Sequence, residues 1–259
     1  MLQGKCALVT GSTGGLGRAI ASRLAAEGCN IVLNGFAEAQ DVEDALSELG
    51  RMGVGAAHHG ADLAVPGQIT DLMRFAAEKF QAVDVLVNNA VVRHSAPIEA
   101  LPVEQWDESL AVNLSAAFHT IRLALPIMRQ RGWGRIVNVA SVYSFIAATG
   151  RADYITTKTA LLGLTRAVAL ETAGSDITCN AVCPGTLPTP PIQARIEHLA
   201  AERGVSVERA TEEYLADRQP GNRFVSVEAV AALVAFLCGP LARDVTGAAM
   251  PVDGGWSAS

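Results

Sequence analysis

A serine, a tyrosine and a lysine within one stretch of the chain have the chemistry needed to move a proton to or from a substrate oxygen. Tyr154 and Lys158 are four residues apart, so they lie one turn from each other if the segment is helical. Tyrosine is a weak acid at neutral pH, and a nearby ammonium favours its phenolate form. Together with the hydroxyl of Ser141, the pair predicts general acid–base chemistry, although the same spacing alone is also typical of exposed helices.

Three glycines near the start of the chain predict a nucleotide-binding turn. Residues 6–10 have strand character, Gly11, Gly15 and Gly17 follow at once, and apolar residues then recur at helical spacing. In such a unit the glycines let the backbone approach a pyrophosphate, and the helix N-terminus offers free N–H groups. A purely structural turn is the alternative for the glycines taken alone.

These motifs fall within a regular alternation of strands and helices. We expect strands over residues 6–10, 30–34, 54–58, 83–88, 135–140, 177–182 and 248–252. We expect helices over residues 16–27, 41–51, 69–80, 103–131, 154–173 and 227–238. The strands are too apolar to alternate, as in a parallel sheet buried on both faces. The pattern predicts an α/β fold, with one doubly wound Rossmann domain over residues 1–259, a seven-stranded parallel sheet and helices on both faces.

Two segments depart from the regular alternation of strands and helices. Pro126 lies inside the longest predicted helix and predicts a kink or a break there. Residues 186–220 carry two short helical patterns, and we expect this insertion to form a helical lid over the substrate. A fixed cap or a subunit contact is the alternative.

Composition argues against several classes of function. The net charge is −6 without a basic tail, so we expect no nucleic acid partner. The five cysteines are scattered, and no histidine grouping has metal-ligand spacing, so we expect no metal. No signal peptide precedes the first strand and no apolar run is long enough to cross a bilayer, so we expect a cytoplasmic protein without a membrane partner.

Taken together, the motifs resemble those of the short-chain dehydrogenase/reductase family. The resemblance spans nearly the whole chain and includes the glycine turn, Asp62-Leu63, Asn88-Asn89-Ala90, Asn113, Ser141, Tyr154, Lys158, Pro184-Gly185 and Val252-Asp253-Gly254-Gly255. It implies an enzyme that interconverts a secondary alcohol and a ketone, with Asn113, Ser141, Tyr154 and Lys158 as the catalytic residues. It also implies that the cofactor is bound by Gly11, Thr13, Gly15, Leu16, Gly17, Asn34, Phe36, Asp62, Leu63, Asn89, Ala90, Tyr154, Lys158, Pro184, Gly185, Leu187 and Thr189.

The end of the second predicted strand favours NAD over NADP. Residues 34–38 contain no lysine or arginine, and neither does the glycine turn, whereas a 2′-phosphate needs a cation there. The acidic residue that usually binds the ribose is absent, so we expect Asn34 to take that role. Val91 also departs from the family, in which a glycine is usual at this position, and valine tolerates a positive φ poorly.

Six stretches carry a more specific likeness: residues 31–36, 94–99, 113–119, 169–174, 218–220 and 252–256. They resemble the bacterial hydroxybutyrate dehydrogenases of this family. The similarity implies an anionic small-molecule substrate, a 3-hydroxybutyrate-like hydroxy acid, that contacts Arg93, Ser141, Tyr143, Arg151, Tyr154, Arg195 and Trp256. The three arginines replace neutral or lysine side chains of those enzymes, and Thr186 replaces a tryptophan. These changes predict a hydroxy acid that is larger or more acidic.

Other assignments stay open on the sequence alone. A dehydrogenase for sugars or polyols, a 3-ketoacyl thioester reductase and a non-catalytic dinucleotide sensor would use the same fold. A sensor has no need for all four catalytic residues, and a polyol enzyme has less use for three arginines. The helix over 154–173 is apolar almost all round and needs a second burial partner, so by analogy with relatives we expect a homotetramer.

Overall fold

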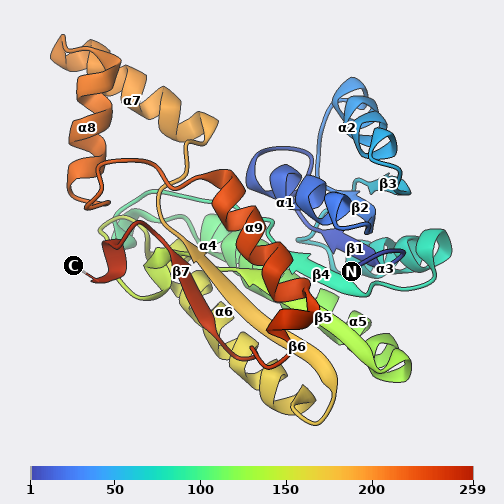
Figure 1. The fold of residues 1–259 in the computed structure, drawn as a ribbon. Coiled ribbons are helices and arrows are strands. Elements are labelled where there is room, and N and C mark those ends of the chain that lie inside the picture. The colour runs from blue at the N-terminus through green and yellow to red at the C-terminus, as the bar shows by residue number, and fades with distance from the viewer. Residues whose placement is uncertain (1, 259) are drawn as a thin grey trace.

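A computed structural model describes residues 2–258, which contain a sheet of seven parallel strands (Figure 1). The strand order is β3-β2-β1-β4-β5-β6-β7. The strands are β1 (Cys6–Val9), β2 (Asn30–Asn34), β3 (Ala56–His59), β4 (Val85–Asn88), β5 (Trp133–Val139), β6 (Asp176–Pro184) and β7 (Ala249–Val252). The order reverses direction between β1 and β4, and in doubly wound sheets ligands bind at the carboxyl ends of the strands at such a point.

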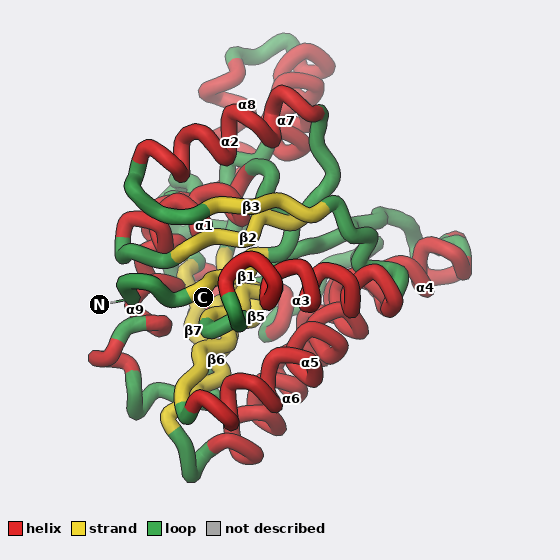
Figure 2. The backbone as a smooth tube through the Cα atoms, turned by 90° about the vertical axis from the view of Figure 1, so that its right-hand side faces the viewer, coloured by secondary structure: helices red, strands yellow, loops and turns green. Residues whose placement is uncertain are grey.

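Helices cover both faces of the sheet (Figure 2). On one face lie α1 (Gly15–Ala26), α2 (Ala39–Arg51) and α9 (Val227–Cys238), around a core that includes Leu24 and Val234. On the other face lie α3 (Pro66–Phe80), α5 (Ala116–Arg131) and α6 (Ala152–Thr172), around a core that includes Leu72 and Ile121. The predicted doubly wound fold is confirmed, with element ends displaced by only one to a few residues.

Local signals mark several helix ends. Pro66 opens α3, where a missing N–H costs nothing, and the Ser226 hydroxyl accepts a hydrogen bond from the Ala229 N–H at the start of α9. Gly132 ends α5 with φ of 68°, and Gly204 ends α7 (Pro190–Arg203) in the same left-handed conformation.

Of the kink or break predicted at Pro126, the break does not occur, and the kink stays a prediction. The helical stretch runs from α4 (Val103–Leu110) through a π-helical turn (Ala111–Ser115) into α5, which continues past Pro126 to Arg131. Contacts of α5 with α3, β4 and β5 hold the helix together despite the hydrogen bond that proline removes. The irregular turn lies instead at Asn113, at the end nearer the cavity described below.

The same stretch corrects the expectation that no apolar segment is long enough to cross a bilayer. Within residues 2–258, Val103–Arg131 meets the length and composition of one membrane-spanning helix. This is weak evidence by itself, because helices packed in the core of a protein pass the same test, and α5 is packed on α3, β4 and β5.

The insertion over residues 186–220 contains the two predicted helices, α7 and α8 (Val207–Ala216). Figure 1 shows both in orange, together at the upper left and away from the other helices. They pack chiefly against each other, with Ile196, Ala200 and Ala210 buried between them. Their position beyond the carboxyl ends of the strands brings them to the region where the ligand site is expected.

Candidate active site

A cavity of about 760 Å³ opens at the carboxyl ends of the strands, between the glycine turn and the α7–α8 insertion. Its lining comes from segments that are far apart in the sequence and that the parallel sheet brings to one edge. The predicted cofactor residues that line it are Gly11, Thr13, Leu16, Gly17, Asn34, Phe36, Asp62, Leu63, Asn89, Ala90, Tyr154, Lys158, Pro184, Gly185, Leu187 and Thr189. Gly15 is not among its lining residues in the described chain; it opens α1 with φ of 54°.

The glycine turn lies in close contact with the segment after β4. A side-chain carbon added at Gly11 would lie 2.8 Å from Cα of Ala90. One added at Gly17 would lie 2.6 Å from Nδ2 of Asn89 and would also collide with the Gly11 carbonyl oxygen. The Asn89 amide donates to that carbonyl oxygen at 3.0 Å, so the turn has no room for side chains at these two glycines.

At Val91, which replaces the usual glycine, the backbone avoids the conformation that valine tolerates poorly. Among the non-glycine residues that the structure describes, only Gln81 and Asn222 have positive φ. The replacement of glycine by valine therefore causes no backbone strain of this kind at the site.

At one end the cavity is bounded by Asn34, Phe36 and Asp62. Asn34 is buried and donates from Nδ2 to the carbonyl oxygens of His59 and Ala61, at 3.0 Å each. Its Oδ1 has no hydrogen-bond partner within the described residues. Phe36 is 74% exposed, and no lysine or arginine of the described chain lines this end.

The three residues predicted for proton transfer face the same cavity. Ser141 follows β5, and its hydroxyl accepts a hydrogen bond from the Tyr143 N–H at 3.2 Å. Tyr154 and Lys158 lie on α6 and are 7% and 2% exposed. The Ser144 hydroxyl donates to the Lys158 carbonyl oxygen at 2.8 Å, which fastens the turn after β5 to α6 and so fixes the three side chains relative to one another.

Lys158 is a buried cation with one main-chain acceptor. Its Nζ donates to the Val139 carbonyl oxygen at 2.6 Å and lies 5.8 Å from the centroid of the Tyr154 ring. Burial, with the Arg93 guanidinium as the second cause, lowers the pKa of Lys158 from 10.5 to about 7. An anion or a polar oxygen brought into the cavity would favour the charged form.

Asn113 does not line the cavity, in contrast to the other three predicted catalytic residues. It lies in the π-helical turn, where its side chain accepts from the Val92 N–H at 2.8 Å and donates to the Val92 carbonyl oxygen at 3.0 Å. It also donates to the Thr157 hydroxyl at 3.3 Å. The side chain thereby joins the segment after β4 to α6, at a residue that lies between Tyr154 and Lys158 in that helix.

Aromatic rings form one wall of the cavity. Tyr143 lies edge-on to Tyr154, with ring centroids 6.2 Å apart, and edge-on to Trp256, with centroids 5.5 Å apart. The Arg93 guanidinium carbon lies 5.3 Å from the centroid of the Tyr154 ring. A cation is thus held over the ring whose hydroxyl is predicted to react.

The remaining predicted arginines differ from each other in position. Arg151 lines the cavity and donates to the His94 carbonyl oxygen at 3.3 Å. Arg195 is exposed on α7, is absent from the described cavity lining, and lies with its guanidinium carbon 5.9 Å from the Tyr214 ring centroid. Arg218 lines the cavity instead, and its guanidinium carbon lies 4.3 Å from the same ring.

Arg218 and Glu108 also line the cavity, and neither is among the site residues predicted from the sequence. The available signal for Arg218 was a basic residue directly after the second helix of the insertion and before Pro220. Glu108 lies on α4 and pairs with His94, with 3.1 Å between Oε2 and Nε2. A carboxylate on an amphipathic helix has no feature in the sequence that separates it from a solvated surface residue.

Comparison with known proteins agrees with the fold. A family model described as enoyl-(acyl carrier protein) reductase matches residues 11–257. The chain is 45% identical to the D-beta-hydroxybutyrate dehydrogenase of Cupriavidus necator over 258 residues, which is 100% of both chains. It is 44% identical to the protein of the same name from Rhizobium meliloti over 255 residues, 98% of this chain and 99% of that one.

Solved structures give the same result. An actinorhodin polyketide ketoreductase crystallised with NADPH has a TM-score of 0.90 and 36% identity, with 98% of each chain covered. A levodione reductase has a TM-score of 0.90 and 30% identity, with 99% of each chain covered. The chain belongs to the short-chain dehydrogenase/reductase family, and it is a dinucleotide-binding oxidoreductase of the alcohol dehydrogenase type.

Proposed function

We propose that this enzyme uses NAD to interconvert the hydroxyl and keto forms of a hydroxy acid similar to 3-hydroxybutyrate. The observation that carries the proposal is that Ser141, Tyr154 and Lys158 share a cavity with the glycine turn, while Arg93 lies over the Tyr154 ring. An anionic substrate would meet a cation beside the group that exchanges its proton. The names of the two hydroxybutyrate dehydrogenases support the same substrate class.

The residues present fit a dinucleotide. The close approach at Gly11 and Gly17 holds the turn against the segment after β4, and Gly15 is exposed at the N-terminus of α1, where a pyrophosphate would lie. Two buried polar atoms of cavity-lining residues, Oδ1 of Asn34 and the hydroxyl of Thr189, have no partner within the described residues. The cofactor residues we propose are the set predicted from the sequence, with Gly15 acting through the shape of the turn.

The cofactor supplies the hydride acceptor, and the protein supplies binding and proton transfer. Tyr154 takes the proton from the substrate hydroxyl in the oxidative direction, and Ser141 donates a hydrogen bond to the same oxygen. Lys158 stabilises negative charge at Tyr154 and, with a nucleotide bound, would hold its ribose. Asn113 acts as a positioning residue in this scheme, because its contacts with Val92 and Thr157 join the two segments on either side.

The absence of a cation at the Asn34–Phe36 end of the described cavity supports NAD over NADP, because a 2′-phosphate there would have the Asp62 carboxylate as a neighbour and no positive charge. The two solved relatives do not decide this point, since one was crystallised with NADPH.

Three further assignments form part of the proposal: one domain over residues 1–259 with the α7–α8 insertion as its lid, a cytoplasmic location, and a homotetramer. Leu170 on α6 is 80% exposed in the single chain, which supports a second burial partner for that helix. Light scattering at micromolar concentration that gives the mass of a monomer would contradict the tetramer.

The test of the proposed function is the appearance of reduced NAD when the purified enzyme is mixed with D-3-hydroxybutyrate and related hydroxy acids. Each acid is compared with its methyl ester, because the ester removes the carboxylate charge and keeps the hydroxyl. We expect turnover of acids and weak turnover of esters, polyols and 3-hydroxyacyl thioesters. Equal turnover of esters and acids would contradict the role of the cavity arginines in binding the substrate carboxylate. Turnover of none of these compounds would contradict the proposed function.

A further inference from the structure

Arg218 is a cavity residue without an anionic partner in the described chain. It lies directly after α8, is half-buried, and lines the cavity together with Tyr214. Its Nη1 donates to the Tyr214 carbonyl oxygen, and its guanidinium carbon lies 4.3 Å from the Tyr214 ring centroid. Stacking on the ring holds the group in place and leaves other N–H donors of the fork without a protein acceptor within residues 2–258.

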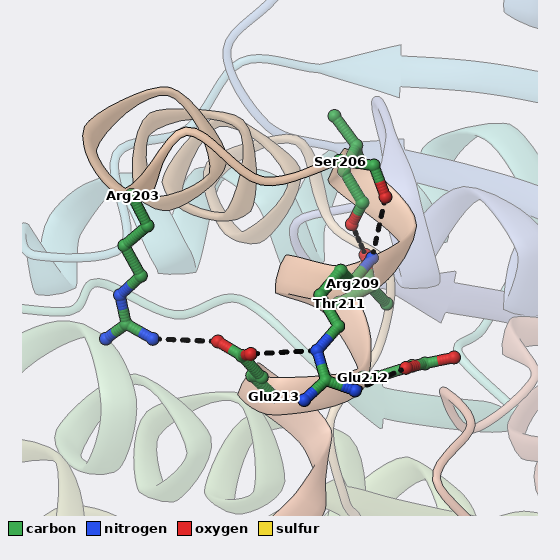
Figure 3. Close-up of polar contacts among 7 residues, drawn as sticks. Arg203, Ser206, Arg209, Thr211, Glu212 and Glu213 are labelled. Atoms are coloured by element: carbon green, nitrogen blue, oxygen red, sulfur yellow. Dashed lines mark hydrogen bonds and ion pairs between the residues drawn. The ribbon is translucent and has the colours of Figure 1, made fainter.

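Two carboxylates of the same insertion, Glu212 and Glu213, form ion pairs with arginines other than Arg218. Figure 3 shows Glu213 between Arg203 and Arg209, with ion pairs of 2.9 and 3.0 Å, and Glu212 paired with Arg209 at 3.4 Å. The Ser206 hydroxyl caps α8 by accepting from the Arg209 N–H. The Arg203–Glu213 pair joins α7 to α8, so the two helices pack as one unit, and Arg218 lies directly after the second helix.

The charged side chains that line this part of the cavity carry an excess of positive charge. Arg93 and Arg151 line it with Arg218, and none of the three forms an ion pair within residues 2–258. At this end the three guanidinium groups share the described lining with one carboxylate, Glu108, whose Oε2 lies 3.1 Å from Nε2 of His94. In a protein of net charge −6, this local excess of guanidinium groups is a recognition feature for anions. A single carboxylate would occupy only part of it.

Arg93 and Arg218 come from different segments of the cavity lining. Arg93 lies over the Tyr154 ring, next to the reacting group. The Arg218–Pro220 segment meets the C-terminal segment at Gly255, where an added side-chain carbon would lie 3.9 Å from Cγ of Pro220. Trp256 follows, and it contacts Tyr143, which contacts Tyr154. Arg218 thus lines the cavity from the α7–α8 insertion, and Arg93 lines it from the segment after β4.

From this arrangement we infer that Arg218 binds a second carboxylate of the substrate, and that the preferred substrate is a dianionic hydroxy acid with a carboxylate at each end. The inference rests on the proposed function and deepens it. One carboxylate lies with Arg93 and Arg151 near the reacting hydroxyl, and the other lies with Arg218 under the α7–α8 insertion. Thr186, a small residue in the cavity lining, leaves room for the longer chain.

The test compares 3-hydroxyglutarate with its monoamide, which has the same length but one charge fewer, and with D-3-hydroxybutyrate. In the wild type we expect kcat/KM for 3-hydroxyglutarate to exceed that for the monoamide by on the order of 30-fold, the effect of one desolvated charge pair. Arg218→Gln should remove this preference by lowering kcat/KM for 3-hydroxyglutarate far more than kcat/KM for the monoamide or for D-3-hydroxybutyrate. Arg195→Gln is the matched control, because Arg195 stacks on the same Tyr214 ring outside the described cavity lining and should change none of these values.

A binding measurement separates this inference from the proposed function. Calorimetry of glutarate with the enzyme and reduced NAD should give an affinity that falls in Arg218→Gln and not in Arg195→Gln, whether or not the enzyme turns over a given alcohol. If D-3-hydroxybutyrate is oxidised but the diacid shows no advantage over its monoamide, the inference is overturned and the proposed function stands. If Arg218→Gln lowers kcat/KM equally for all three acids, or leaves glutarate binding unchanged, the second-carboxylate site is also overturned.

Discussion

The Nζ atom of Lys158 donates a hydrogen bond of 2.6 Å to the carbonyl oxygen of Val139, the last residue of β5. This hydrogen bond joins β5 to α6 through the Lys158 side chain. Ser141 lies two residues after Val139. The bond holds a buried amine beside the Tyr154 ring, and the cost of burying its charge is seen in the lowered pKa of Lys158, about 7. The charged form of this group becomes more favourable when an anion or a nucleotide oxygen arrives.

Replacement of Lys158 by Met should remove a pH dependence of stability in the ligand-free enzyme. The pKa of Lys158 is about 7 in the folded protein, whereas its ordinary value is 10.5, so the unfolded chain binds more protons between these two values. The free energy of unfolding therefore rises with pH in this window, by up to about 1.4 kcal/mol per pH unit. Below pH 7 both states are protonated and this contribution is constant.

Urea unfolding of the wild type and Lys158→Met between about pH 7 and pH 8.5 checks this expectation. The upper limit matters because burial raises the pKa of Cys179 from 9.0 to about 12, so that above pH 9 this thiol makes stability fall as the pH rises. If the free energy of unfolding changes with pH in the same way in both proteins, the expectation is contradicted, because Lys158 then has the same charge in the folded and unfolded states.

Tyr154→Phe should abolish turnover and retain nucleotide binding. The ring keeps its edge contact with Tyr143 and its place under Arg93, so only the hydroxyl is lost. Loss of a general acid–base group lowers kcat by on the order of 10²- to 10⁴-fold. Steady-state kinetics and fluorescence titration with reduced NAD measure the two effects. Tyr143→Phe is the control, and a Tyr154→Phe enzyme with wild-type kcat would contradict the mechanism.

Gly17→Ala should impair nucleotide binding or folding, whereas Gly14→Ala should not. The added carbon at Gly17 meets Nδ2 of Asn89 at 2.6 Å and the Gly11 carbonyl oxygen, so it forces the turn apart at a cost of about 1–3 kcal/mol. Gly14 has extended backbone and open space around the added carbon. Denaturant unfolding and titration with reduced NAD distinguish the two variants, and equal behaviour would refute the close-approach argument.

Phe36→Arg should shift the cofactor preference towards NADP. The side chain of Phe36 is 74% exposed at the end of the cavity where the described lining carries no cation, so a guanidinium there would be free to pair with a 2′-phosphate. Such a charge-assisted contact improves the ratio of kcat/KM for NADP over NAD by about 10- to 100-fold. Phe36→Gln controls for loss of the ring. An unchanged ratio would mean that the ribose lies elsewhere.

Most of the fold follows from sequence pattern, and particular residues show why. The strands β4 and β5 are too apolar to alternate, which predicts buried parallel strands because such strands fit a sheet covered on both faces. The glycine turn predicts the nucleotide end because its requirement is local, a backbone without side chains between a strand and a helix. Pro126 shows the limit of local signals, since tertiary contacts of α5 outweigh the hydrogen bond that it removes.

Residue types and spacing predict which chemistry is available: a tyrosine, a lysine and a serine that one helix and one turn can bring together, and a glycine turn for a dinucleotide. Which arginines face the cavity depends on how the chain packs. Arg195 and Arg218 both stack on Tyr214 and cannot be ranked by type or spacing, yet only Arg218 is part of the described cavity lining. An arginine side chain faces solvent or a cavity according to how its segment packs, and that packing is set by contacts between residues that are distant in the sequence.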